Sequence, residues 1–167
     1  AAARAQEAYS QIHHGASGVA RIAKHGFLER HWLGIHMGFF NDEDLDLLRT
    51  GRAHVAHCPS TSMLEGKGIL REGRILDAIT AGIPVGLASD TSDQGSMLRQ
   101  MQLAYAGHKE AKGDDRVLTS YAVLDLATTT GAACVGLGDT VGRIKPGMAA
   151  DIIIFSVDSL EYGSGRD

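Results

Sequence analysis

Apolar segments of strand length alternate with helical segments along the chain, and this alternation limits the fold more than any other feature. Strands are predicted at residues 31–37, 53–58 and 83–88, and helices at residues 41–51, 69–82 and 97–112. A strand–helix repeat of about 30 residues is typical of parallel βα units. Right-handed crossovers place the carboxyl ends of such strands on one edge, which carries the chemistry in sheets and barrels.

The flanking segments extend this α/β pattern. Further helices are predicted at residues 2–12, at 17–27 with Ser17 as the N-cap, and at 118–136. Residues 60–68, after Pro59, are predicted to form a polar loop, and a Pro-Gly turn leads into a last strand around residues 151–158. His108 and Lys109 are expected on a solvated helix face.

Bulk properties exclude several classes of protein. The 167 residues are too few for a whole (β/α)8 barrel, which needs about 250. A formal net charge of −4 without a basic stripe argues against nucleic acid or an anionic membrane as a partner. No apolar run is long enough to cross a bilayer. Cys58 and Cys134 form no CxxC motif, so we expect reduced thiols in a cytoplasmic protein.

One polar, chemically versatile residue follows each predicted strand. These residues are His36, His57 and Asp90. Nitrogen and oxygen ligands with one water form the usual catalytic zinc site, in which the metal lowers the pKa of that water to about 7. Simpler interpretations stay open. A single histidine at a strand end is more often only hydrogen-bonded, and an aspartate after a buried strand often caps the next helix.

Other common functional motifs are missing from the sequence. It contains no GxGxxG segment, no Walker glycine loop and no GxSxG elbow. The acidic run at residues 42–46 lacks the spacing and the glycine of an EF-hand loop, and is expected to start a helix. A small domain that binds a phosphorylated ligand is therefore disfavoured, because no phosphate-binding loop is present.

Three segments together resemble a known family. Residues 33–62 (LGIHMGFFNDEDLDLLRTGRAHVAHCPSTS), 68–93 (GILREGRILDAITAGIPVGLASDTSD) and 126–158 (LATTTGAACVGLGDTVGRIKPGMAADIIIFSVD) are similar to the carboxyl-terminal half of metal-dependent amidohydrolases. The most similar branch contains guanine deaminase, S-adenosylhomocysteine deaminase, cytosine-deaminase-like enzymes and triazine hydrolases. The match covers the chain from about residue 17 onward.

The resemblance implies a role for each site residue. Asp90 matches the aspartate of barrel strand eight, which ligates the metal and acts as general base and then acid. His36 matches the strand-six histidine, which polarises the substrate. His57 matches the histidine of a His-Cys-Pro-x-Ser-Asn segment, although Ser62 replaces its asparagine. We expect His57, Ser62 and Asp93 to contact the substrate.

The same resemblance predicts an incomplete barrel. Residues 1–145 would form about strands six to eight of a TIM barrel with their helices, and residues 146–167 the return strand of a small β-sandwich and a loose tail. The family's His-x-His and His-x-x-Glu segments are not in this chain. Three strands leave two open edges, so we expect either a partner segment that supplies the amino-terminal half of the barrel or self-association.

Two hypotheses follow from these observations. The first is a fragment of an enzyme that hydrolyses a carbon–nitrogen bond, deaminating a purine-, pyrimidine- or triazine-like small molecule with zinc, or alternatively iron, as the divalent metal. The second is a truncated module without catalytic activity, which acts only structurally or by association. The missing metal ligands favour the second for the chain by itself, and metal content separates the two.

Overall fold

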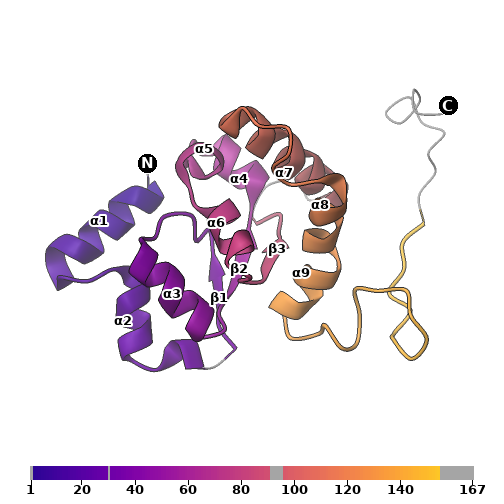
Figure 1. The fold of residues 1–167 in the computed structure, drawn as a ribbon, viewed down its shortest axis with the longest axis horizontal. Coiled ribbons are helices and arrows are strands. Elements are labelled where there is room, and N and C mark those ends of the chain that lie inside the picture. Colours follow the sequence, from indigo (N-terminus) through magenta and orange to yellow (C-terminus); the bar gives the residue numbers. More distant parts are fainter. Residues whose placement is uncertain (1, 30, 91–95, 155–167) are drawn as a thin grey trace.

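A three-stranded parallel sheet forms the centre of the molecule (Figure 1). The structure, a computed structural model, describes residues 2–29, 31–90 and 96–154. The strands lie in the order β1 (Leu33–Ile35), β2 (His54–His57) and β3 (Val85–Leu87). In register, Ile35 pairs with Ala56, which pairs with Gly86. The predicted parallel βα arrangement is therefore confirmed for the described part of the chain.

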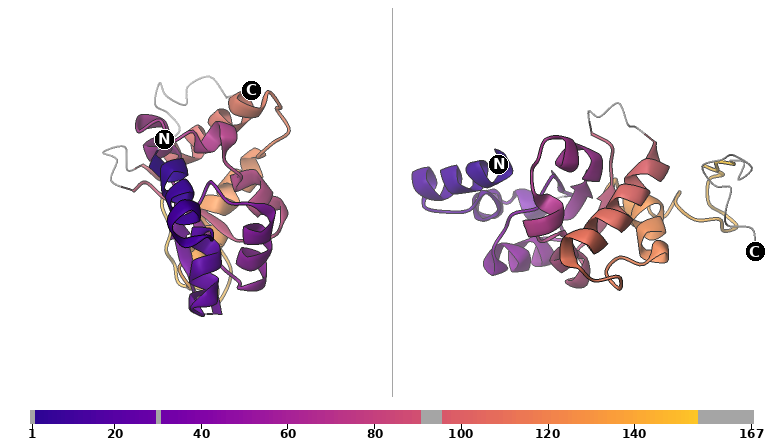
Figure 2. Two further views of the ribbon diagram at one scale, coloured as in Figure 1. Left: turned by 90° about the vertical axis from the view of Figure 1, so that its left-hand side faces the viewer. Right: turned by 90° about the horizontal axis from the view of Figure 1, so that it is seen from above.

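Helices precede, connect and follow the strands. In chain order they are α1 (Ala2–His14), α2 (Gly18–Lys24), the 3-10 turn Phe27–Glu29, α3 (Asp42–Thr50), α4 (Pro59–Leu64), α5 (Ile69–Glu72), α6 (Ile75–Thr80), α7 (Met97–Lys112), α8 (Ser120–Ala127) and α9 (Thr129–Cys134). Helix α1 lies at one end of the molecule and the segment after α9 extends from the other (Figure 2). The sheet and its surrounding helices lie between them.

Side-chain caps fix where two of the predicted helices begin. Ser17 precedes α2, and its hydroxyl accepts a hydrogen bond from the Ala20 amide at 2.9 Å. Asn41 and Asp44 form a reciprocal capping box at the start of α3. Each cap satisfies an amide that the helix itself leaves without a partner. Both positions agree with the boundaries expected from the sequence.

The single helix predicted at residues 69–82 is wrong. The backbone of Gly73 is extended, with ψ at 164°, and this divides the segment into α5 and α6. The next amide, from Arg74, donates to the carbonyl of Gly38 at 2.8 Å. A tertiary hydrogen bond thus takes the donor that a continuous helix would have used, which periodicity cannot reveal.

Two other segments also differ from the prediction. The polar loop expected at residues 60–68 contains α4, which begins at Pro59, a residue well suited to the first helical position because it needs no amide partner. The helix expected at residues 118–136 is interrupted at Thr128, where φ is −125° and ψ is −88°. The Thr128 hydroxyl donates to the Leu124 carbonyl at 2.7 Å, a bond by which threonine competes with the helix backbone.

The last predicted strand is absent from residues 151–154. The turn before it does form, with Gly147 at φ 89° and the Met148 amide donating to the Lys145 carbonyl at 3.2 Å. A strand needs a neighbour for its backbone groups, and nothing in residues 2–154 that the structure describes pairs with this segment. Residues 155–167 lie outside the described residues, and the division at residue 145 stays a prediction.

The hydrophobic core lies between the sheet and the helices around it. Its fully buried members include Leu48, Val55 and Ile75, each 0% exposed. Both cysteines are buried and neither forms a disulfide, as the sequence predicts. None of the helices in the described ranges is long and apolar enough to cross a membrane.

The contact between β3 and α9 depends on a glycine. A Cβ atom on Gly86 would lie 3.0 Å from Cα of Gly131 and 3.3 Å from Sγ of Cys134. The first of these neighbours is backbone, which cannot rotate away as a side chain can. Gly86 therefore permits the close approach of helix and sheet.

We predict that Gly86→Val lowers the free energy of unfolding by about 1–3 kcal/mol, the usual cost of overpacking a core. Urea unfolding of the two chains measures the difference. Gly18→Ala is the control, since its added Cβ would meet only Oε2 of Glu7, at 3.8 Å. Equal stability of Gly86→Val and the original chain would show that α9 is not seated on β3 as described.

Candidate active site

His36 and Asp90 meet at the carboxyl edge of the sheet, although 54 positions separate them in the sequence. His36 follows β1 directly, and Asp90 comes three residues after β3. Nε2 of His36 lies 2.8 Å from Oδ2 of Asp90, and the two side chains are 20% and 24% exposed. The structure thus brings these two residues together at the strand ends, while their catalytic and metal-binding roles stay predictions.

Hydrogen bonds that continue the sheet hold the backbone near both residues. The His36 amide donates to the Ala56 carbonyl at 3.1 Å, which extends the pairing of β1 with β2 by one position. The Ala88 amide donates to the His57 carbonyl at 2.9 Å, which does the same for β2 and β3. The sheet therefore fixes the two strand ends relative to each other.

Both residues also have left-handed backbone conformations, with φ at 57° for His36 and 55° for Asp90. Only two other non-glycine residues in the described ranges do so, Arg52 and Leu118. A non-glycine residue pays about 1–2 kcal/mol for this conformation. Such strain gathers at functional sites, where the surrounding structure enforces it. Two strained residues in direct contact thus mark this edge as the candidate site.

Lys67 is a third member of the cluster, which sequence reasoning missed. Its Nζ lies 3.2 Å from Nε2 of His36 and 3.1 Å from Oε2 of Glu65, and its side chain is only 11% exposed. The available signal was its position between two glycines, Gly66 and Gly68, which take left-handed φ values of 60° and 75°. Lysine is rarely buried to this extent without a specific partner.

The two neighbours of His36 make different demands on one ring nitrogen. A protonated Nε2 donates to the Asp90 carboxylate, whereas an unprotonated Nε2 accepts from the Lys67 ammonium. The imidazole therefore has a hydrogen-bond partner in either tautomer. This arrangement suits a residue whose proton moves during a reaction.

Two of the other predicted site residues, His57 and Ser62, are buried. His57 is 1% exposed and its Nε2 lies 3.1 Å from Nε2 of His108, on α7. Ser62 is buried in α4, with no hydrogen-bond partner for its Oγ among the described residues. Asp93 falls outside the described residues. The substrate contacts expected of these three residues stay predictions.

His108 is not on a solvated helix face as expected, because it is 0% exposed. The error arose because an isolated histidine among Lys109, Glu110 and Lys112 has the appearance of a surface residue. Its spacing of four from the small, buried Ala104 was the signal that could have placed it on the packed face.

Burial controls the charge of the groups below the site. It lowers the pKa of His57 to about 3 and that of His108 to about 4, with smaller contributions from the other imidazole for His57 and from Lys112 for His108. Burial and the nearby Asp90 charge raise the pKa of the Cys58 thiol to about 11. At neutral pH both imidazoles and the thiol are uncharged.

A cavity of about 410 Å³ lies beside His36 and Lys67. Its wall is mostly apolar and includes Val19, Ile22 and Phe39. This volume is within the range of small-molecule sites, about 300–1,000 Å³. A cavity that joins an apolar wall to an imidazole and an ammonium could hold a flat, partly polar ligand.

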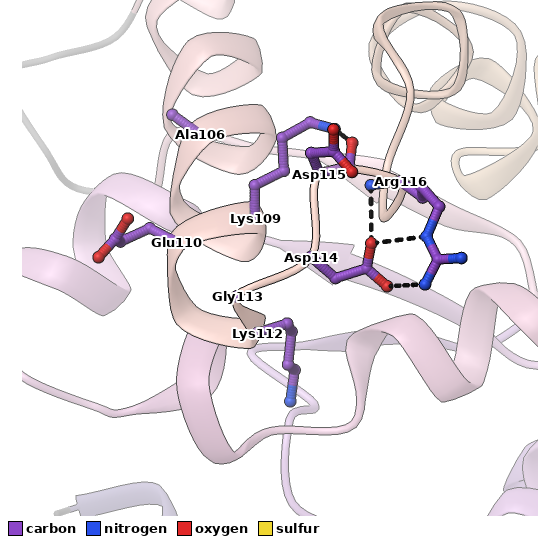
Figure 3. Close-up of a pocket in the computed structure, with 8 residues that line it drawn as sticks. All are labelled: Ala106, Lys109, Glu110, Lys112, Gly113, Asp114, Asp115 and Arg116. Carbon is purple, nitrogen blue, oxygen red and sulfur yellow. Dashed lines mark hydrogen bonds and ion pairs between the residues drawn. The ribbon is translucent and has the colours of Figure 1, made fainter.

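A larger depression, of about 980 Å³, lies at the end of α7 (Figure 3). Among its charged side chains, Arg116 pairs with Asp114 at 2.9 Å, and Nζ of Lys109 contacts the Asp115 carbonyl. Its lining does not include His36, His57, Ser62 or Asp90. It is therefore a less suitable site than the carboxyl edge.

The donor atoms at the edge fit a divalent metal only in part. A carboxylate oxygen is a ligand that zinc accepts, and Asp90 supplies one. In the described ranges, however, no three His, Cys, Asp or Glu side chains converge as a metal site requires. A catalytic zinc needs three protein ligands, a set that the described residues by themselves do not supply.

Comparison with known proteins identifies the family. A model of the amidohydrolase family matches residues 2–163, and the chain belongs to that family. The 5-methylthioadenosine/S-adenosylhomocysteine deaminase of Pelotomaculum thermopropionicum is 34% identical over 144 residues, which cover 84% of this chain and 32% of that protein. The same enzyme of Syntrophomonas wolfei is 32% identical over 148 residues, with coverages of 86% and 34%.

Solved structures agree with the fold. An adenosine deaminase from Xanthomonas campestris with bound zinc superposes with a TM-score of 0.83 over 97% of this chain and 37% of its own, at 22% identity. Atrazine chlorohydrolase from Arthrobacter aurescens, complexed with zinc, gives 0.83 over 97% and 36%, at 25% identity. The chain thus spans about a third of the length of these relatives.

The buried histidines predict a loss of stability in acid. Their pKa values are lower in the folded chain than in the unfolded chain. Unfolding therefore takes up protons below about pH 6.5, and stability decreases as the pH decreases. Between about pH 7 and pH 5, each buried histidine should lower the free energy of unfolding by about 2 kcal/mol. Urea unfolding at both pH values measures the loss.

The control variants separate these histidines from the carboxylates, which also titrate in acid. His108→Gln should lose less stability than the original chain over the same range, because one titrating group is gone. His25→Gln, a change at an exposed histidine, should leave the loss unchanged. The same pH dependence in all three chains would contradict the burial of His108.

Proposed function

We propose that this chain is the carboxyl-terminal catalytic portion of a metal-dependent amidohydrolase that deaminates an aminated heterocycle. The contact of 2.8 Å between His36 and Asp90, at the ends of two parallel strands, carries this proposal. The deaminase relatives support the reaction class, and the zinc in two solved relatives supports the metal. We assign β1 to β3 to barrel strands six to eight, and residues 146–167 to the start of a β-sandwich.

Asp90 and His36 share the chemistry in this proposal. Asp90 ligates the metal, accepts a proton from the attacking water and delivers it to the leaving amine. His36 stabilises the negative charge that develops on the substrate in the transition state. A zinc ion, when bound, supplies Lewis acidity and lowers the pKa of its water to about 7. His57, Ser62 and Asp93 are the proposed substrate-binding residues.

The substrate of this proposal is a purine-, pyrimidine- or triazine-like amine. The apolar wall of the cavity beside His36 suits the faces of a heterocycle, and His36 and Lys67 add polar groups to its lining. Iron is the alternative metal, since nitrogen and oxygen ligands suit both ions. A cytoplasmic location fits the two unbridged cysteines.

Completion of the site requires residues from elsewhere. We propose that a segment equivalent to the amino-terminal half of the barrel pairs with the open edges of the sheet, or that two copies of the chain associate through them. The lack of a three-residue metal cluster in the described ranges favours the alternative of a catalytically incompetent module for the chain alone. The proposed activity therefore belongs to the completed barrel.

A chimera tests this proposal. The chain would replace the matching third of the Pelotomaculum deaminase, whose remaining residues would supply the missing strands. We expect the chimera to bind zinc and release ammonia from S-adenosylhomocysteine. Asp90→Asn should lower kcat by about 10²–10⁴-fold, the usual contribution of a general base. Ammonia release and zinc content are measured together.

Asp139→Asn is the matched control, because Asp139 is exposed and far in sequence from the strand ends, and it should retain full activity. A folded, zinc-loaded chimera that releases no ammonia would point to the incompetent module. Undiminished activity in Asp90→Asn would remove Asp90 from the chemistry.

A further inference from the structure

Helix α7 presents a fully buried face that includes two polar side chains. Gln100, Ala104 and His108 are spaced by four residues and each is 0% exposed. This face packs on α4 and α5, and a Cβ on the neighbouring Gly107 would come within 3.1 Å of Cε of Met63. Polar side chains are rarely buried to this extent unless they bind specific partners.

The partner of His108 is the predicted site residue His57. Their Nε2 atoms lie 3.1 Å apart, with ring centroids separated by 5.1 Å. Two imidazole nitrogens can bond only when one donates and the other accepts, so a single proton lies between them. Burial keeps both rings neutral, which this arrangement requires. The bond joins the carboxyl end of β2 to the carboxyl-terminal part of α7, the chain's longest described helix.

Gln100 accepts a hydrogen bond from a backbone amide in the first turn of α4, where the helix itself offers no acceptor. The N-cap residue Cys58 makes no side-chain hydrogen bond, and Pro59 has no amide hydrogen. The next amide, from Ser60, donates to Oε1 of Gln100 at 3.2 Å. A residue 40 positions away thus performs the task that a serine or aspartate at the cap performs in other helices.

The segment held in this way is in contact with the candidate site on both sides. The Thr61 hydroxyl donates to the carbonyl of Ser89, the residue before Asp90, at 3.3 Å. The Lys67 amide donates to the Ser62 carbonyl at 2.9 Å, and Lys67 in turn contacts His36. Hydrogen bonds therefore run from α7 through residues 57–62 to His36 and to the backbone beside Asp90.

We propose that His108 and Gln100 are positioning residues, which act through His57 and α4 to hold the ends of the strands in place at the His36–Asp90 pair. Their importance for catalysis rests on the function proposed above. The hydrogen bonds themselves do not, since they lie within this chain and need neither metal nor substrate.

Nuclear magnetic resonance of the 167-residue chain with ¹⁵N-labelled histidine tests the imidazole bond. We expect a scalar coupling between the two Nε2 nuclei, which only a shared N–H···N hydrogen bond transmits. His108→Phe should abolish the coupling and shift the ring nitrogens of His36. It should also speed amide exchange at Ser62 and Lys67 by about tenfold, the value of one net hydrogen bond of about 1.4 kcal/mol.

Two further variants complete the test. His108→Gln returns a polar partner for His57 and should recover the exchange rates and the His36 resonances, which a purely packing role would not explain. Gln100→Leu should speed exchange of the Ser60 amide by about tenfold while the coupling between the imidazoles persists. His25→Phe and Gln102→Leu, at exposed positions, are the matched controls and should change none of these signals.

The proposal is overturned if the original chain shows no coupling. It is also overturned if His108→Phe and Gln100→Leu leave the amide exchange at residues 60–67 and the His36 resonances unchanged. Should His108→Phe fail to fold, His108→Gln and Gln100→Leu decide the question. An inactive chimera would defeat the proposed function but leave these signals intact, so the two failures are distinguishable.

Discussion

Parallel pairing of three short strands is the constraint on which the rest of this structure depends. Because β1, β2 and β3 run in one direction, the residues that follow them emerge on one edge. The continuing hydrogen bonds at His36 and Ala88 then fix how far each chain proceeds before it turns away. Only this arrangement brings an imidazole and a carboxylate 54 positions apart to 2.8 Å and holds both in left-handed conformations. The chemistry of the edge is a consequence of strand direction, not of local sequence.

Buried polar side chains from α7 provide hydrogen-bond partners for the residues at the end of β2. An unpaired buried polar group costs about 1–3 kcal/mol, so a helix start and a buried imidazole at the end of β2 need partners. Gln100 and His108 supply these from α7, which follows β3 in the chain. The residues after β2 therefore gain these hydrogen-bond partners only when β3 and α7 are in place. Such a dependence of one βα unit on the next favours cooperative folding of the described region.

The parallel strands and the helix caps could be predicted from short-range patterns, and the shared edge of His36 and Asp90 from the common direction of the strands that carry them. Alternating apolar segments define parallel units, and Ser17 and Asn41 lie where a first turn needs an acceptor. The errors have the opposite origin. Arg74 bonds to Gly38, Ser60 to Gln100 and His57 to His108, each across 36 to 51 positions. The residues next to Arg74 do not indicate such a partner, so the break in the helix escaped prediction, and only the spacing from Ala104 indicated that His108 lies on the packed face.

The chain contains the residues that support the His36–Asp90 pair, but it leaves part of its apolar surface uncovered. The supports of His36 and Asp90, from sheet backbone to α7, all lie within the described residues. Several large apolar side chains in the described residues are, by contrast, left exposed. Ile35, on the edge strand β1, is 61% exposed, and Ile144 and Ile154 are 91% and 95% exposed. An exposed β-branched side chain on an open strand edge, as at Ile35, is a feature that further strands cover. The relatives are about three times as long, and in the completed barrel proposed above a further strand paired with β1 would cover Ile35.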